Sequence, residues 1–140
     1  MKRWLIAGML LCLICGCSRN PEEPLCPRHI EIPFYPPIAN SANISGTVAL
    51  TLTIDAEGKV EDVNARTTDS KVPGTRLLET GSVANIRRWT FAKPRSAPYT
   101  QTISYRYEIT RSLPPDGPAN VTFDLPHLVT IATGGRSAEQ

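Results

Sequence analysis

The stretch ISGTVALTLTI, residues 44–54, alternates between two kinds of residue more regularly than any other part of the chain. One set of alternate positions is apolar or glycine: Gly46, Val48, Leu50, Leu52 and Ile54. The positions between them are small and mostly polar. A period of two residues is typical of a strand with one buried face. The stretch therefore predicts a half-buried strand, and every later element can be explained as extending or covering it.

A turn and a returning strand follow this segment. Asp55-Ala56-Glu57-Gly58 ends in a glycine, which can adopt the positive φ of a tight turn, and Lys59 to Thr68 resumes the alternation. The two segments predict a β-hairpin. Val60 is out of phase with Val63, which predicts a bulge just after the turn.

Residues Thr75 to Arg88 predict a helix, with Thr75 as its N-cap. Its buried face should carry Leu78, Ser82, Ile86 and Trp89. Trp89 and Phe91 are expected to be core residues that join the helix end to the sheet. Gly81 costs about 1 kcal/mol relative to Ala in a helix interior, so either the helix is marginal there or a close approach to the sheet requires a small residue. Arg87 and Arg88 suit a solvated last turn.

Tyr99 to Ile109 alternates again and predicts a third strand. Val121, Phe123 and Leu125 alternate in the tail, where Pro126 requires an edge or a bend. We expect 120–133 to fold back as an additional strand on the edge of the third strand. The predicted fold is α+β: a small antiparallel sheet of three strands and a C-terminal extra strand, with one helix across one face.

The N-terminus has Lys2-Arg3 and then a short apolar run, Trp4 to Ile14, which is too short for a comfortable membrane span. The sequence Ile14-Cys15-Gly16-Cys17 resembles the lipobox of bacterial lipoproteins. This resemblance implies cleavage after Gly16 and a lipid on Cys17; an uncleaved anchor or an ordinary signal peptide is the alternative. Ser18 favours the outer membrane by analogy with Gram-negative lipoproteins.

The chain thus divides into a leader (1–16), a Pro-rich tether (17–34), a folded domain (35–112) and a C-terminal extension with a frayed end (113–140). Prolines in the tether disfavour helix and strand, whereas Phe34 to Ile38 is apolar enough to pack against the domain. Cys26 is the one cysteine that remains beside Cys17, so no intramolecular disulfide is expected. It is either an unpaired bystander or a link between molecules.

No residues predict catalysis, a metal or a cofactor. His29 and His127 lack a partner at triad or metal-ligand spacing. The formal net charge is +2, and removal of the leader leaves equal numbers of basic and acidic residues. That balance argues against nucleic-acid binding.

Several segments, in this order, resemble the C-terminal domain of the TonB family: Tyr35-Pro36, Ser45 to Val48, Ile54 to Val60, Ile86 to Phe91 and Ile103 to Tyr107. The resemblance covers about residues 35–109. It implies a small antiparallel sheet with one helix, which binds a short segment of an outer-membrane receptor as an added strand. The partner would add to the edge of the third strand, at Gln101, Ile103, Tyr105 and Tyr107.

The chain departs from the type member of that family, which has an inner-membrane helix and a long Pro-rich arm. The leading hypothesis is therefore a lipid-anchored, non-enzymatic periplasmic module that binds an envelope protein or receptor segment by strand addition. A structural or assembly lipoprotein, able to form a homodimer by edge pairing, is the second hypothesis. Energy transduction to an outer-membrane receptor is the third.

Overall fold

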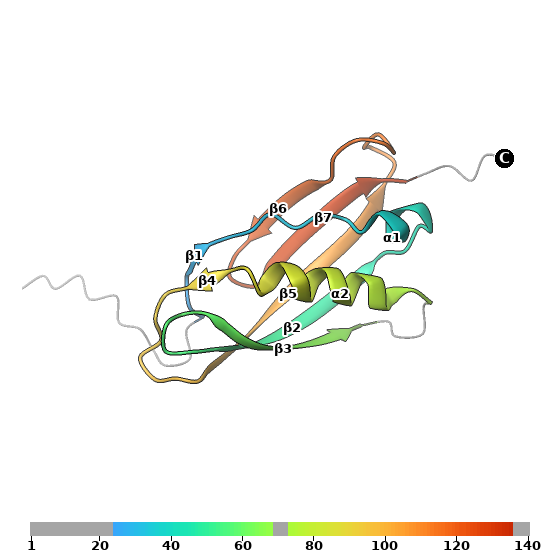
Figure 1. The fold of residues 1–140 in the computed structure, drawn as a ribbon. Helices are drawn as coiled ribbons and strands as arrows, with labels where there is room; N and C mark the ends of the chain where they lie inside the picture. Colours follow the sequence, from blue (N-terminus) through green and yellow to red (C-terminus); the bar gives the residue numbers. More distant parts are fainter. Residues whose placement is uncertain (1–23, 69–72, 136–140) are drawn as a thin grey trace, which may run out of the picture.

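The computed structural model describes residues 24–68 and 73–135; the leader, the lipobox and the start of the tether lie outside these ranges. In chain order the elements are β1 (Pro27–His29), α1 (Pro37–Ser41), β2 (Gly46–Ile54), β3 (Val60–Thr67), α2 (Thr75–Ile86), β4 (Thr90–Phe91), β5 (Tyr99–Thr110), β6 (Asn120–Asp124) and β7 (Leu128–Gly134). Five strands form one sheet in the order β3-β2-β5-β7-β6. The helix α2 and the N-terminal segment lie across one face of it (Figure 1). The α+β class is as predicted.

The hairpin predicted from residues 44–68 is confirmed. Strand β2 pairs antiparallel with β3, and the register changes from Thr53↔Asp62 to Ile54↔Val60, so Glu61 is the extra residue of a bulge next to the turn. Asp55 Oδ1 accepts hydrogen bonds of 2.9 Å from the N–H groups of Glu57 and Lys59. These bonds explain why the acidic residue opens the turn.

The predicted helix is also confirmed, although it ends at Ile86. The prediction of Thr75 as the N-cap is wrong: Thr75 is the first helical residue, and Gly74, with φ of 88°, precedes it. A left-handed backbone at that position favours glycine. Gly81 does permit a close approach, because a Cβ there would lie 3.2 Å from Cγ of Pro36. The close neighbour belongs to the N-terminal segment rather than to the sheet.

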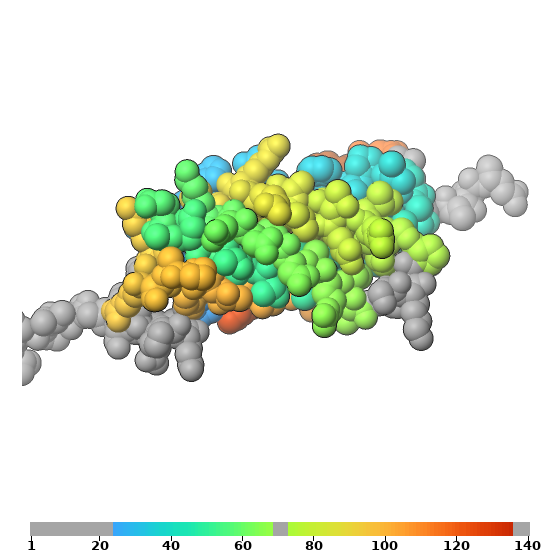
Figure 2. Space-filling model, turned by 60° about the horizontal axis from the view of Figure 1, so that its bottom comes forward, coloured from blue at the N-terminus to red at the C-terminus, as the bar shows by residue number. Residues whose placement is uncertain are grey.

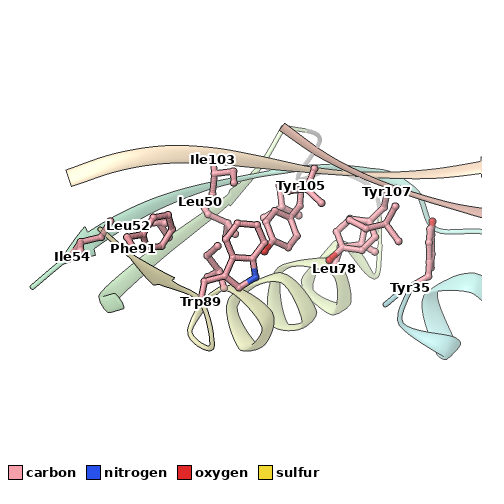
Figure 3. Close-up of a cluster of buried hydrophobic side chains, with 14 of the residues drawn as sticks. Tyr35, Leu50, Leu52, Ile54, Leu78, Trp89, Phe91, Ile103, Tyr105 and Tyr107 are labelled. Atoms are coloured by element: carbon pink, nitrogen blue, oxygen red, sulfur yellow. The ribbon is translucent and has the colours of Figure 1, made fainter. Parts of the chain in front are cut away.

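The core lies between α2 and the sheet (Figure 3). Trp89 and Phe91 are each only 1% exposed, which confirms them as core residues. Trp89 Nε1 donates to the Glu31 carbonyl and to Asn85 Oδ1, both at 3.1 Å, and the Tyr105 hydroxyl donates to the same Oδ1 at 2.6 Å. One polar network therefore joins the N-terminal segment, the helix and the central strand.

The expectation that the Pro-rich segment lacks strand is wrong for 27–29, because β1 pairs with β4. The Leu25 side chain is buried, and its N–H donates to Gln101 Oε1 at 2.8 Å. We call residues 30–36 the strap. In Figure 1 the strap runs from β1 to α1 beside α2. Packed structure therefore begins ahead of Tyr35.

Only part of the apolar run 34–38 packs as expected. The Tyr35 ring meets the Tyr107 ring edge to face at a centroid distance of 5.4 Å, and its hydroxyl donates to the Ile44 carbonyl. By contrast, Phe34 is 64% exposed and Ile38 is 68% exposed. The strap is thus attached through one set of side chains and presents others to solvent.

The tail folds back onto the third strand, as predicted, but in a different arrangement. Strand β7 pairs parallel with β5 over Ser104–Thr110, and β6 pairs antiparallel with the far side of β7. The sheet is therefore not wholly antiparallel. Val129 and Ile131 of β7 are completely buried, whereas β6 carries Asn120 and Asp124 and suits an edge. Pro126 lies in the turn between the two strands.

Three buried tyrosines predict loss of stability in base. Burial raises the pKa of Tyr107 to about 12, against the smaller lowering effect of its hydrogen bond with Ser82. Burial, reinforced by Tyr107, also raises the pKa of Tyr35 and of Tyr105. In the unfolded chain these tyrosines ionise at about pH 10. Their contribution to the free energy of unfolding is therefore complete below that pH and is lost as the pH rises toward the folded-state pKa.

The expected slope reaches about 1.4 kcal/mol per pH unit for each such tyrosine. Urea unfolding between pH 8 and 11.5 measures it. Tyr105→Phe lowers stability at every pH, through loss of the bond to Asn85, but should make the slope shallower. An unchanged slope in this variant would contradict the role of Tyr105.

Candidate functional site

The side chains predicted to line a partner-binding edge are buried instead. They are between 0% and 8% exposed: Gln101, Ile103, Tyr105 and Tyr107. All lie on the face of β5 that meets the core, and Tyr107 and Tyr105 bond to Ser82 and Asn85 of α2. The backbone edge of β5 is also occupied, since β7 pairs along Ser104–Thr110. These residues thus hold the layers together and form no open surface.

A short part of the predicted edge is left beside residues 99–103. These residues pair with β2, and the pairing of β5 with β7 begins only at Ser104. Ser104 N–H donates to the His127 carbonyl on the β7 side. Since backbone groups alternate along a strand, Thr100 and Thr102 direct theirs to the same side. The part of β5 that β7 leaves uncovered is therefore short.

The same alternation identifies the open groups of β6. Two hydrogen bonds fix the pattern between β5 and β7: Ser104 N–H donates to the His127 carbonyl, and Gly135 N–H donates to the Thr110 carbonyl. The odd-numbered residues of β7 therefore bond to β5, and the even-numbered residues direct their main-chain groups toward β6. Thr130 therefore exchanges hydrogen bonds with Thr122 of β6. Val121 and Phe123 consequently direct their N–H and C=O groups away from the sheet. Four main-chain groups lie along this outer edge.

The opposite edge, β3, is less suited to a partner. Thr68 N–H donates to the Thr47 carbonyl, so Val63, Ala65 and Thr67 of β3 direct their main-chain groups outward. This edge also contains the bulge, and its charged residues are Glu61, Asp62 and Arg66. Bulges and charges are the usual protection of an edge strand. In Figure 2 the green hairpin lies against α2 on this side of the molecule.

The β6 edge lacks such protection. Its pairing with β7 is regular, and Asp124 is its one charged residue. Phe123 is 36% exposed, and its ring lies 6.2 Å from that of Trp89. Asn120, Thr122 and Asp124 occupy the alternate positions. An added strand would therefore meet an apolar side chain on one face of the sheet and polar side chains on the other.

The described residues show no arrangement typical of a catalytic or metal centre. No group of three or more His, Cys, Asp and Glu within 24–68 and 73–135 could hold a metal ion. His29 Nε2 lies 3.6 Å from Glu31 Oε2 at the surface, and His127 is exposed. Cys26 is free and exposed, whereas Cys17 lies outside the described residues. None of the helices in this part of the chain is long and apolar enough to cross a membrane.

The sequence predicted one edge strand over 120–133 and did not separate 120–124, which is the outer strand, from 128–134, which pairs with β5. The signal that could have done so is the difference between the two tail segments. Val129 and Ile131 are β-branched and have no charged neighbour within 128–134, whereas 120–124 ends in Asp124. A strand in the middle of a sheet favours β-branched residues without charged neighbours, as in 128–134.

A family model described as "Gram-negative bacterial TonB protein C-terminal" matches residues 31–109. The match begins in the strap and ends inside β5, so β6 and β7 lie beyond it. A comparison with curated proteins found no match. The family match covers more than half of the chain and agrees with the observed hairpin, helix and central strand. The chain therefore belongs to the family of Gram-negative TonB C-terminal domains, which are periplasmic protein-interaction modules.

Proposed function

We propose that this protein is a lipid-anchored periplasmic module that binds an extended segment of an envelope protein by strand addition to β6. The observation that carries the proposal is the outer edge of β6, where Val121 and Phe123 direct their main-chain groups away from the sheet. Family membership supports a protein-interaction role. Because β7 occupies β5, the unprotected edge of the sheet lies one strand pair farther out.

Strand addition needs only main-chain donors and acceptors, with side chains supplying the selectivity. Each new hydrogen bond contributes about 0.5–1.5 kcal/mol, so the four groups of Val121 and Phe123 supply a modest affinity. The exposed part of Phe123 would add apolar contact on the helix side of the sheet. A partner with alternating apolar and polar residues fits these two faces.

Crosslinking in cells tests the edge directly. A photo-reactive amino acid at exposed Thr122 should capture a partner, and Val121→Pro should reduce that capture at least several-fold. Proline removes an outward N–H without removing a bond of the β6–β7 ladder. Ala65→Pro removes the corresponding outward N–H from β3 and is the matched control, which should leave capture unchanged. Equal loss in both variants, or loss only in Ala65→Pro, would contradict the β6 assignment.

A second copy of the chain is the alternative occupant of this edge. Antiparallel pairing of two β6 strands centred on Thr122 would place Asn120 opposite Asp124 of the other copy, so that no like charges oppose each other. Crosslinks at twice the chain mass would support this assembly role. Capture of an outer-membrane receptor would support the module proposed above, and capture of inner-membrane motor subunits would indicate energy transduction.

The lipid anchor predicts a separate result. Wild-type protein should enter the detergent phase in phase partitioning, because more than one acyl chain gives stable anchoring. Cys17→Ser should release a soluble form or accumulate as precursor. Cys26→Ser is the control and should partition as the wild type does. The anchor assignment is wrong if the Cys17→Ser protein enters the detergent phase to the same extent as the wild type.

A further inference from the structure

The large apolar side chains that are most exposed are concentrated in one short segment. Ile32 is 71% exposed, Phe34 64% and Ile38 68%, and Phe123 at 36% completes the set of exposed large hydrophobic residues in 24–68 and 73–135. Scattered single apolar residues on a surface are ordinary. Three within seven residues are a local concentration, which we call the stripe: Ile32, Phe34 and Ile38.

The stripe is held rigidly by the residues between its members. The Glu31 carbonyl, next to Ile32, accepts hydrogen bonds from Asn85 Nδ2 at 3.0 Å and Trp89 Nε1 at 3.1 Å. Pro33 and Tyr35, on either side of Phe34, are buried. Ala39, next to Ile38, is completely buried, so α1 is fixed as well. Exposed and buried side chains alternate from Ile32 to Tyr35, and the exposed ones project from a backbone that these contacts hold.

Exposed arginines lie close to the strap, one before it in the sequence and one in contact with Glu31. Arg28 is exposed in β1, directly before the strap. Arg87 and Arg88 are exposed at the end of α2, and Arg88 Nη1 reaches Glu31 Oε1 at 3.4 Å. Glu31 is the acidic residue of 24–38. Apolar side chains flanked by arginines suit the boundary between acyl chains and phosphate headgroups.

The distance to the proposed anchor limits where the strap can lie. Residues 18–23 separate Cys17 from Pro24. Even fully extended, that connection spans only about 25 Å. Leu25 is already packed against the domain. A lipid on Cys17 would therefore keep the folded body at the membrane surface, with the strap as the first long segment after β1.

From these observations we infer that the stripe docks onto the lipid surface in which Cys17 is anchored. The inference rests on the lipid anchor of the proposed function. Docking would insert Ile32, Phe34 and Ile38 into the interface and fix the orientation of the domain. Since Trp89 contacts both Glu31 and Phe123, the open β6 edge would lie close to the membrane plane, beside the periplasmic surface of membrane proteins.

The test uses the mature chain, residues 17–140, with Cys26→Ser, so that Cys17 is its one thiol. Cys17 is coupled to a maleimide lipid in vesicles of phosphatidylethanolamine and phosphatidylglycerol, which restores the anchor whether or not the cell adds one. Phe34→Trp then reports docking: its emission should shift to shorter wavelength and be quenched at least twofold by brominated lipid. Trp89 is buried, and the same chain with Phe34 retained supplies the background.

A second measurement omits the anchor. The Cys17→Ser chain should co-sediment with the same vesicles, and replacement of the stripe by Ser at all three positions should lower its partition coefficient at least about tenfold. Replacement of three exposed residues on the open face of the sheet, Thr51, Thr102 and Glu108, by Ser is the matched control. Both triple variants should melt as the wild type does, because exposed substitutions away from special features change stability little.

Unshifted and unquenched emission from the tethered Phe34→Trp protein would overturn the inference, and so would equal vesicle binding by the stripe variant and the wild type. Loss of partner crosslinking at Thr122 in the stripe variant, with vesicle binding unchanged, would also overturn it and assign the stripe to a protein partner. Whether the cell attaches a lipid to Cys17 is decided separately, by the phase partitioning of the wild-type and Cys17→Ser proteins made in cells.

Discussion

Trp89→Ala is expected to lower the free energy of unfolding by about 3–5 kcal/mol, the usual cost of truncating a large aromatic residue in a core. The Trp89 ring lies 6.2 Å from Phe91 and 6.3 Å from Tyr105, between the helix end and the sheet. Its indole N–H also bonds to Glu31 and Asn85. The substitution therefore removes packing and leaves a carbonyl oxygen with one donor fewer.

The melting temperature should fall by more than about 10 °C, since a domain of this size loses about 4–8 °C per kcal/mol. Thermal unfolding followed by circular dichroism measures the change. Phe34→Ala is the matched control: it removes an aromatic ring that is 64% exposed and should change stability by less than about 0.5 kcal/mol. Normal melting of Trp89→Ala would contradict this contribution to stability, and lost partner capture beside it would assign Trp89 to partner binding.

The elements predicted correctly are those whose signal is local. The alternation of 44–54, the turn at Asp55 and the spacing of Leu78, Ser82 and Ile86 each follow from the period of one strand or helix. A turn residue and its neighbours suffice to specify the β2–β3 hairpin. Such features do not depend on what the rest of the chain does.

The packing of residues 24–33 could not be predicted because the contacts that stabilise it are distant in sequence. The bond from Leu25 to Gln101 spans 76 residues, and that from Trp89 to Glu31 spans 58. A Pro-rich composition lowers the local preference for regular structure, but Glu31 uses a backbone carbonyl, which every residue has. Nothing in the composition of 24–33 distinguishes a packed segment from a free tether.

Two segments of the tail could each have paired with the edge of β5. Both 120–124 and 128–134 alternate, and the sequence predicted a single strand over 120–133 on the edge of β5. The complete burial of Val129 and Ile131 decides it. Because β7 pairs with β5, the edge predicted on β5 is occupied. The candidate edge is therefore the outer side of β6, at Val121 and Phe123.

Amide exchange gives a test of this arrangement at single residues. Thr122 bonds to β7 and should exchange slowly, whereas the outward N–H groups of Val121 and Phe123 should exchange rapidly. The amides of Val129 and Ile131, in the middle of the sheet, should be the most protected of the tail. Rapid exchange throughout 121–131 would show that the tail is not paired.

Deletion of the chain after Ser112 should destabilise the domain and make it aggregate, because it removes both β6 and β7. Complete burial of Val129 and Ile131 contributes about 3–6 kcal/mol at 1.5–3 kcal/mol per side chain, a large part of the 5–15 kcal/mol typical of a small domain. The deletion also uncovers Tyr105 and Tyr107 and leaves the edge of β5 unpaired along 104–110, an exposed edge of the kind that associates with other chains. Light scattering and sedimentation velocity should show large assemblies of this truncated protein. A protein truncated after Gly135 keeps β7 and should have the same assembly state as the full chain. A truncated protein that stays monomeric and melts normally would mean that the tail contributes little to the fold, and the displacement of the partner edge from β5 to β6 would lose its physical basis.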